Sequence, residues 1–140
     1  MAHFAQQIAA IERGRRPPTL DTGNLSPQRD LTDVRDIVQA YILVMERGRV
    51  GEVYNAGSGT TASMQAVLDR LLALAEVQVE VRRQEELMRR RESSAVRCDA
   101  GKLRRETGWA PRISLDQTLR DTLAYWRGQM SAECGVRSAE

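Results

Sequence analysis

Gly23-Asn24-Leu25-Ser26-Pro27-Gln28-Arg29-Asp30-Leu31-Thr32-Asp33-Val34-Arg35-Asp36 decides the fold of this chain, together with Gly51-Glu52-Val53-Tyr54-Asn55-Ala56-Gly57-Ser58. The small and polar residues that open the first block predict a turn. Asp33 can cap a helix after this turn, since an aspartate side chain accepts hydrogen bonds from the free N–H groups of a first helical turn. The second block predicts a short strand at Glu52–Asn55 with a glycine-rich exit. A turn, a helix and a strand therefore follow one another in fixed order.

Apolar spacing predicts one long amphipathic helix between these two blocks and further helices on either side. The long helix ends at the glycines that follow it, and its apolar residues share one stripe: Val34, Ile37, Val38, Tyr41, Ile42 and Met45. Other helices are expected over residues 4–13, from Ser63 onward, from Asp99 to Glu106 and from Ser114 onward. Ser114 forms a capping box with Gln117.

Strands are expected only at Glu52–Asn55, Gln78–Arg82 and Val96–Cys98. The second of these alternates valines with polar residues, which predicts a half-buried strand. Helices that alternate with short strands indicate the α/β class, but strands this few and short cannot make a complete doubly wound sheet. We expect one domain over residues 1–130 and a disordered tail over residues 131–140, because the tail has few apolar residues.

Composition limits the function classes that this chain can belong to. Its 140 residues, 41% of them hydrophobic, suffice for a buried core. We expect a cytoplasmic protein without a membrane span, because there is no apolar run of about 18 residues and no signal-peptide pattern. Cys98 and Cys134 lack metal-ligand spacing and are expected to be reduced thiols. His3 is the only histidine, which disfavours histidine catalysis and a metal site.

The residues that could carry chemistry are arginines, since no nucleophile–base pair and no phosphate-binding glycine loop is present. Arg29 follows the turn and could pair with a pyrophosphate through two charge-assisted hydrogen bonds, or form an ordinary surface ion pair with Asp30 or Asp33. The run Arg89-Arg90-Arg91-Glu92 could also bind phosphate, or form a solvated helix face. Asp33 and Asp36 fit a helix start better than a catalytic carboxylate pair.

Three stretches together resemble the extended short-chain dehydrogenase/reductase superfamily, the NAD-dependent epimerases and dehydratases. They are Asn24–Asp36, Gly51–Gly59, and Lys102-Leu103 with Thr107-Gly108-Trp109-Ala110-Pro111. The Arg-Asp-x-x-x-Val-x-Asp spacing is shared across the superfamily. The Gly-Asn-Leu before it and the later Gly-Trp-Ala-Pro make the likeness greatest to GDP-4-dehydro-6-deoxy-mannose reductases and next to GDP-mannose 4,6-dehydratases. The resemblance covers residues 4–127.

Such enzymes have an N-terminal Rossmann domain for NAD(P) and a smaller C-terminal domain for the sugar nucleotide, and the resemblance places this chain in the second. By position, Arg29 resembles the arginine that contacts the diphosphate. Arg89 and Glu92 match an Arg-x-x-Glu/Asp element that holds the diphosphate or the ribose, although Arg90 stands where a proline often follows.

Two further substrate-binding residues are implied by the same resemblance. Arg15, or its neighbour Arg16, falls in the extended segment that flanks the nucleobase. Gln7 lies on the helix that faces the substrate, which is a weaker match. The implied ligand is a GDP-sugar.

The catalytic and cofactor-binding residues of the superfamily are not found in this sequence. The Rossmann glycine fingerprint is missing, and no tyrosine stands in a Tyr-x-x-x-Lys pattern, because the fourth residue after Tyr41, Tyr54 and Tyr125 is Met45, Ser58 and Gln129. Hydride transfer needs such a tyrosine beside a bound nicotinamide. We therefore expect no catalytic residue and no cofactor bound by this chain alone, with NAD(P) implied for the intact enzyme.

The absent Rossmann half has a physical consequence. In the superfamily the strand that matches Glu52–Asn55 joins the Rossmann sheet, so here its edge would be unpaired. The apolar stripe of the long helix would also lose part of its cover.

These observations leave three functions open. The first is the sugar-nucleotide-binding part of a GDP-sugar reductase that reduces a 4-keto sugar nucleotide when intact, or of a related dehydratase or epimerase. The second is a non-enzymatic module that associates with a separate Rossmann subunit or with a second copy of itself. The third, a nucleic-acid binder, is disfavoured by a net charge of only +2 and few aromatic residues.

Overall fold

A computed structural model of the chain describes residues 1–87 and 93–136, and side chains up to residue 131. Helices predominate among the elements, and the strands are short. In chain order the elements are α1 (Ala2–Glu12), β1 (Thr19–Thr22), β2 (Gln28–Arg29), α2 (Val34–Arg47), β3 (Ala62–Ser63), α3 (Met64–Leu72), β4 (Glu80–Arg83), η1 (Glu85–Leu87), β5 (Ala95–Val96), α4 (Gly101–Thr107) and α5 (Leu115–Val136).

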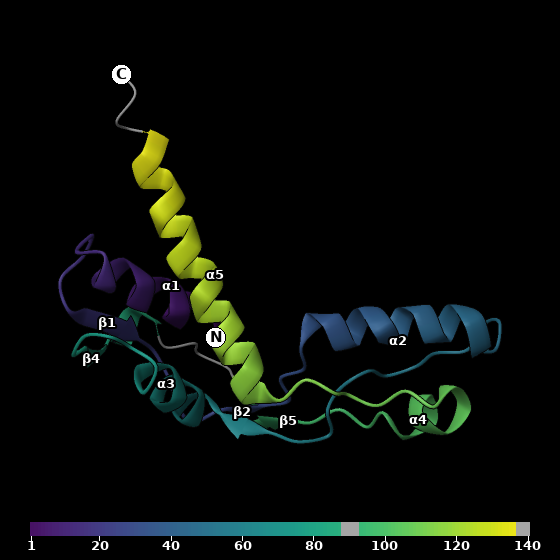
Figure 1. Cartoon of the computed structure of the whole chain (residues 1–140). Coiled ribbons are helices and arrows are strands. Elements are labelled where there is room, and N and C mark those ends of the chain that lie inside the picture. The colour runs from purple at the N-terminus through teal and green to yellow at the C-terminus, as the bar shows by residue number, and fades with distance from the viewer. Residues whose placement is uncertain (88–92, 137–140) are drawn as a thin grey trace.

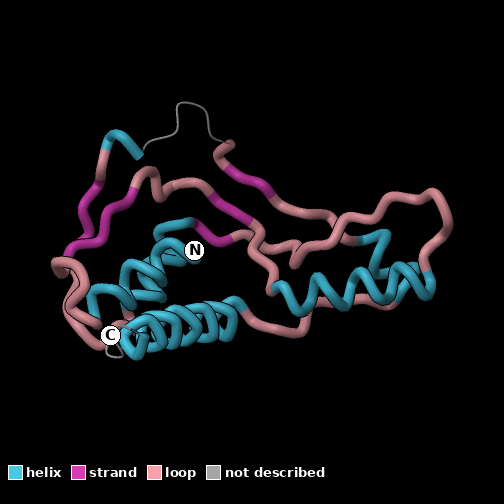
Figure 2. The backbone as a smooth tube through the Cα atoms, turned by 90° about the horizontal axis from the view of Figure 1, so that it is seen from above, coloured by secondary structure: helices cyan, strands magenta, loops and turns pink. Residues whose placement is uncertain are grey.

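The elements form two regions, which Figures 1 and 2 show side by side. We call the first the lobe; it contains α1, β1, α3, β4 and α5. The second, which we call the arm, contains α2, α4 and the loops at residues 48–61 and 108–113, and it extends away from the lobe. Strands β2, β3 and β5 lie where the two regions meet, and we call this small sheet the joint.

The lobe has its own hydrophobic core. Helix α1 packs against α5, and α3 packs against both. Apolar residues of α1 recur at helical spacing, so they lie on one face of the helix and are buried against the same neighbours. The core residues of this cluster are Phe4, Ala5, Ile8, Ala9, Ile11, Leu20, Leu25, Val67, Leu68, Leu71, Leu119 and Leu123.

Two small sheets connect these helices. In the lobe β1 pairs with β4 in parallel, with Thr19 opposite Glu80. In the joint the central strand β2 runs antiparallel to β3 and parallel to β5. The joint therefore brings the residues around 28, 62 and 95 together, although they are far apart in the sequence.

The arm has a much smaller core, formed by Ala40, Ala100, Leu103 and Trp109. The indole Nε1 of Trp109 donates to the carbonyl oxygen of Asp36 at 2.9 Å, which ties the Gly-Trp-Ala-Pro segment to the start of α2. The apolar stripe on the other side of α2 is exposed: Tyr41 is 64% and Met45 87% accessible. The described residues thus leave this stripe uncovered.

The predicted strand at Glu52–Asn55 is wrong, because these residues form an extended loop. A strand needs a neighbouring strand for its backbone groups, and within residues 1–87 and 93–136 none lies beside this segment. Side chains of α4 hold it instead. The phenolic oxygen of Tyr54 donates to Glu106 at 2.6 Å, and Lys102 Nζ donates to the carbonyl oxygen of Val53 at 2.9 Å.

Most predicted helices are confirmed, including their caps at Asp33 and Ser63. Asp99 is not itself the cap of α4, since Ala100 occupies that position, but the Asp99 carboxylate accepts from the N–H of Gly101 at 2.8 Å. Strand β4 is exposed throughout rather than half-buried.

The end of the chain and the last predicted strand also differ from expectation. Strand β5 spans Ala95–Val96 and so lies at the start of the predicted Val96–Cys98 segment. Helix α5 continues to Val136, into the segment for which the sequence predicts disorder. None of the helices in the described ranges is long and apolar enough to span a membrane.

Candidate functional site

A pocket of about 330 Å³ lies beside Arg29, the arginine that the sequence singles out. Its walls come from the start of α1, the end of β1 with the turn that follows, β2, the start of α3 and η1. The lining residues are His3, Phe4, Asp21, Thr22, Gly23, Asn24, Arg29, Met64 and Leu87. Apolar side chains, one arginine and Asp21, whose carboxylate accepts from Arg16 and Gln84, thus line the same hollow. The apolar wall and the arginine suit a ligand with a flat ring and a charged group.

Arg29 is half-buried at the end of β2. Its guanidinium Nη1 donates to the carbonyl oxygen of Gln28 at 2.8 Å and to that of Ser93 at 2.9 Å. These bonds hold the side chain along the joint, at the edge of the pocket. A planar guanidinium held in this way can present parallel N–H donors to phosphate oxygens.

The turn before Arg29 shapes another wall of the pocket. The side-chain oxygen of Asn24 accepts from the N–H of Ser26 at 3.0 Å, which closes the turn locally. Gly23 lies directly against η1, and a Cβ at this position would collide with the carbonyl oxygen of Leu87. The Gly-Asn pair therefore permits a close approach between the turn and the segment that borders the pocket.

Gln7 supports the pocket from behind. Its side-chain amide donates to the carbonyl oxygen of Asp21 at 3.0 Å, and its side-chain oxygen accepts from the Asp21 N–H at 3.0 Å. Gln7 is 3% exposed, so both polar atoms are used to hold β1 in place. The structure therefore connects Gln7 with the pocket through Asp21 and does not place it among the lining residues.

Of the two arginines in the Arg15-Arg16 alternative, Arg16 lies nearer to the pocket lining. Arg16 donates to the Asp21 carboxylate at 3.0 Å. Hydrogen bonds from Gln84 and Arg16 together hold the pKa of Asp21 below its ordinary value. Arg15 instead donates to the carbonyl oxygen of Met130 at 2.6 Å, on α5.

Arg89 and Glu92 lie outside the described residues. The described chain stops at Leu87 and resumes at Ser93, and both of these residues border Arg29 or its pocket. The structure brings together Arg29, the Gly23–Asn24 turn and the Asp21 backbone that Gln7 holds.

Sequence reasoning missed the role of Asp30, which follows Arg29. Its carboxylate accepts hydrogen bonds from the Gly57–Gly59 loop and from the backbone of Cys98. Burial opposes ionisation of Asp30, but the hydrogen bonds from Ser58, Cys98 and Gly59 outweigh it and hold the pKa of Asp30 below its ordinary value. The Gly57–Gly59 loop belongs to the second opening block and its continuation, whereas Cys98 lies far from both blocks, and sequence alone does not show that these segments meet.

Asp33 and Asp36, the other two aspartates of the Asn24–Asp36 stretch, connect α2 to α5 and to the loop that precedes α5. Asp33 caps α2, pairs with Arg35 at 2.8 Å and accepts from the Thr118 hydroxyl at 2.8 Å. The bond from Arg35 is the main reason that the pKa of Asp33 is strongly lowered. Asp36 lies in the first turn of α2, as predicted, and also accepts from the N–H groups of Arg112 and Ile113 at 3.1 and 3.0 Å.

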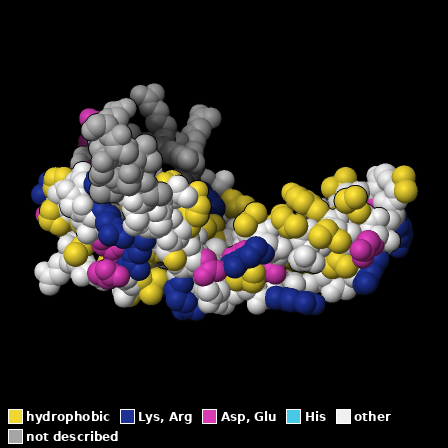
Figure 3. Space-filling model, turned by 45° about the horizontal axis from the view of Figure 1, so that its top comes forward, with side chains coloured by type: hydrophobic (Ala, Val, Ile, Leu, Met, Phe, Trp, Pro, Cys, Tyr) yellow, Lys and Arg dark blue, Asp and Glu magenta, His cyan; other side chains and the backbone are white. Residues whose placement is uncertain are grey.

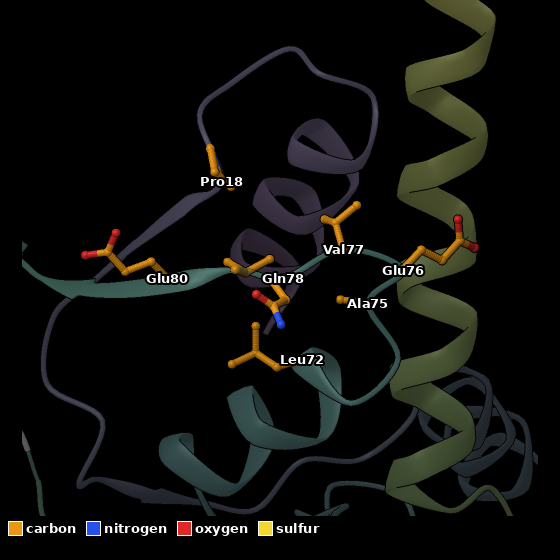
Figure 4. A pocket seen from close by; sticks show the side chains of 8 residues that line it. Pro18, Leu72, Ala75, Glu76, Val77, Gln78 and Glu80 are labelled. Carbon is orange, nitrogen blue, oxygen red and sulfur yellow. The ribbon is translucent and has the colours of Figure 1, made fainter.

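A larger hollow of about 740 Å³ lies elsewhere on the lobe, between α3 and the start of β4. Figure 4 shows Leu72, Ala75 and Val77 around it, with the carboxylates of Glu76 and Glu80 at opposite ends. Two carboxylates and no lining arginine make this hollow unsuitable for a diphosphate. Among the residues that the structure describes, no group of three or more His, Cys, Asp or Glu side chains could hold a metal ion.

Comparison with known proteins gives a consistent family. A family model for GDP-mannose 4,6 dehydratase matches residues 1–122. The chain is 33% identical over 133 residues to GDP-6-deoxy-D-mannose reductase of Pseudomonas aeruginosa, covering 95% of this chain and 44% of that protein. It is 35% identical over 108 residues to dTDP-glucose 4,6-dehydratase of Haemophilus influenzae, covering 70% of this chain and 32% of that protein.

A solved structure gives the same result. RMD from Pseudomonas aeruginosa, complexed with NADPH, superposes with a TM-score of 0.84 at 34% identity, over 91% of this chain and 42% of that chain. The chain thus spans less than half the length of these relatives. The predicted fold class is confirmed, since the few short strands and many helices correspond to the C-terminal region of extended short-chain dehydrogenases/reductases. The chain therefore belongs to the GDP-mannose 4,6-dehydratase family, within the NAD-dependent epimerase/dehydratase superfamily.

Proposed function

We propose that this chain is the sugar-nucleotide-binding part of an NAD(P)-dependent reductase that reduces a GDP-4-keto-6-deoxy sugar. The observation that carries the proposal is the pocket beside Arg29, in a chain 33% identical to a GDP-6-deoxy-D-mannose reductase. Arg29 would contact the diphosphate, and Phe4, Met64 and Leu87 offer apolar surface for the rest of the nucleotide. Arg89 and Glu92 would complete the site from the neighbouring segment.

NAD(P) enters this proposal through the intact enzyme only. The described residues do not fit a dinucleotide, which needs a strand that runs through a glycine-rich turn into a helix. Here β3 leads directly into α3 through Ser63, without a glycine. The chain also offers no Tyr-x-x-x-Lys pair for proton transfer. The proposed contribution of this chain is therefore binding and orientation of the sugar nucleotide.

The nucleobase and the reaction type define the alternative within the same family. The match to a dTDP-glucose 4,6-dehydratase supports the alternative that the chain is part of a dehydratase or epimerase that binds another nucleotide sugar. Titration with GDP, dTDP and UDP separates these options, and tighter binding of GDP supports the proposed substrate. Equal or tighter binding of dTDP or UDP would favour the alternative.

The central test is calorimetric titration of the full chain with GDP and GDP-mannose. Arg29→Ala should weaken GDP binding by roughly tenfold or more, because a charge-assisted hydrogen bond is worth about 1.5–3 kcal/mol. Arg70→Ala is the matched control: Arg70 is also an arginine in an ion pair, but it bonds Asp116 at 2.9 Å and does not line the pocket. Full-strength GDP binding by Arg29→Ala would overturn the assignment of Arg29.

Association with another chain is a second candidate, favoured by the exposed stripe of α2. Figure 3 shows hydrophobic side chains gathered along the arm. Several are largely exposed, among them Val34, Tyr41, Met45, Val50 and Val53. A contiguous apolar surface of this kind marks an interaction site. Its occupant would be a separate Rossmann domain or a second copy, and a concentration-independent monomer in light scattering would argue against self-association.

We also propose that the protein is cytoplasmic and has no nucleic-acid partner. The near-balanced charge of +2 supports the latter, since nucleic-acid binders carry a strongly basic surface.

A further inference from the structure

We propose that Asp30 is a positioning residue for Arg29, which holds the joint in the register that directs the guanidinium to the pocket. This inference rests on the proposed function, because it concerns the same diphosphate contact. Asp30 does not line the pocket, so it would act through Arg29 alone.

The Asp30 carboxylate joins segments that are far apart in the sequence. Oδ1 accepts from the backbone N–H and the hydroxyl of Ser58, at 3.0 and 2.6 Å. Oδ2 accepts from the N–H of Gly59 at 2.8 Å and from that of Cys98 at 3.1 Å. One side chain therefore ties β2 to the loop that leads to β3 and to the chain that leaves β5.

The packing around this carboxylate leaves little space for adjustment. Gly57 lies so close that a Cβ there would collide with the side chain of Cys98 and would also meet Asp30 Oδ2 at 3.2 Å. The loop must therefore come near both strands at this point, and the Gly57-Ser58-Gly59 sequence allows it.

Arg29 depends on the same register. Strands β2 and β5 have two residues each, so their ladder is short: the N–H of Gln28 bonds the Ser94 carbonyl at 2.8 Å, and the N–H of Asp30 bonds the Val96 carbonyl at 3.0 Å. The Asp30 bond to Cys98 fixes the same chain just beyond this ladder. The carbonyl of Ser93, which accepts from the Arg29 guanidinium, lies just before it.

The chemistry requires a carboxylate at this position. Every partner of Asp30 is an N–H or O–H donor, and the two oxygens share five bonds from Thr32, Ser58, Gly59 and Cys98. In Asp30→Asn one oxygen becomes an NH₂ group, which would face donors instead of accepting from them. Either the Ser58 side or the Gly59 and Cys98 side must then separate.

The test compares GDP with guanosine, since the affinity ratio of the two isolates the contribution of the diphosphate. Ligand-observed NMR titrations of the full chain measure both affinities below the melting temperature. We expect Arg29→Ala to lower the ratio roughly tenfold and Asp30→Asn to lower it by roughly three- to tenfold, with guanosine binding unchanged. The double variant should lose no more than Arg29→Ala alone, because Asp30 acts through Arg29.

Asp36→Asn is the matched control for a merely structural effect. Like Asp30, Asp36 accepts backbone N–H groups from a distant segment, those of Arg112 and Ile113, but it is buried and lies in the arm. It should lower the melting temperature and leave the GDP-to-guanosine ratio as in the wild type. If the affinity ratio falls in Asp30→Asn and Asp36→Asn in proportion to the fall in melting temperature, the inference is overturned. It is also overturned if the losses of Arg29→Ala and Asp30→Asn add up in the double variant.

Two further outcomes separate this inference from the proposed function. A wild-type chain that prefers GDP through Arg29, together with an Asp30→Asn variant of unchanged ratio, overturns the positioning role only. A wild-type chain without any preference for GDP over guanosine overturns the proposed function and the inference with it. Should Asp30→Asn fail to fold, Ser58→Ala decides. It removes the 2.6 Å hydroxyl bond to Asp30 together with the hydroxyl's bonds to Thr60, but it keeps the Ser58 N–H bond to Asp30, and the ratio should fall roughly twofold. An unchanged ratio in Ser58→Ala then overturns the role of Asp30.

Discussion

The lobe and the arm differ in how completely each buries its own apolar residues. The lobe closes twelve hydrophobic residues into one cluster, whereas the arm closes four and leaves the stripe of α2 in water. Both regions have well-capped helices, so local signals alone do not cause the difference. The lobe can supply its own packing partners, while the arm is packed on one side only. The lobe and the joint form the pocket beside Arg29, and the arm exposes an apolar surface.

Equivalent core substitutions in the two regions should differ most. Leu123 in the lobe and Leu103 in the arm are both buried leucines. Leu123→Ala should lower the free energy of unfolding by about 3–4 kcal/mol, and Leu103→Ala by about 2 kcal/mol, because the smaller arm core can collapse around the missing side chain. Urea unfolding measures both values.

The two tryptophans report the regions separately in the same experiment. Trp109 belongs to the arm core, and Trp126 packs against the lobe core. Leu103→Ala should shift the Trp109 transition, read in a Trp126→Phe background, more than the Trp126 transition, read in a Trp109→Phe background. An arm variant that costs as much as the lobe variant, with both tryptophans shifting together, would show that the two regions unfold as a single unit.

Acid should weaken the connection between the regions before it affects the lobe core. The folded-state pKa values of Asp30 and Asp33 are lowered, so their stabilisation is fully present above the unfolded pKa of about 4 and is lost as the pH falls below it. We expect each aspartate to account for roughly 1 kcal/mol of the stability lost between about pH 5 and pH 2.

Asp33→Asn checks this sign. The variant should be less stable than the wild type at neutral pH, and the gap should narrow as the pH falls. The Trp109 signal in urea unfolding follows it. Asp116→Asn is the control, since Asp116 is 58% exposed in its ion pair with Arg70. A gap that stays constant with pH would show that the Asp33 carboxylate is not stabilised by folding.

The sequence predicts the helices of both regions well, because caps and apolar spacing are local signals. Asp33, Ser63 and Ser114 each mark a helix start, and α2 begins and ends close to its predicted bounds. The strand at Glu52–Asn55 fails for a non-local reason, since a strand exists only beside another strand. Its valine and tyrosine favour a strand, but the neighbouring residues of α4 hold it as a loop.

The candidate site shows the same limit. Arg29 could be singled out from its place after a turn, and the family resemblance supports it. The bonds of Gln7 to Asp21 and of Asp30 to Ser58 and Cys98 join residues far apart in the chain, so no local pattern reveals them. Asp30 stands next to Arg29 in the motif, and only the structure shows that it joins three segments.

The smallest expected effect on stability is at the exposed stripe of α2, and it tests directly whether the arm is uncovered in solution while the lobe is closed. Tyr41 is 64% exposed on α2, so Tyr41→Ser should change the free energy of unfolding by about 0.5 kcal/mol or less. Leu123→Ala in the lobe should lower the free energy of unfolding by several times that amount, because Leu123 is enclosed by the lobe core. Urea unfolding of the dilute chain measures the difference, and Glu46→Gln on the exposed surface of the same helix controls for charge and helix propensity. A cost above about 1.5 kcal/mol for Tyr41→Ser would mean that the stripe is covered in solution by another chain or copy. In that case the arm would be a buried interface of an assembly already formed.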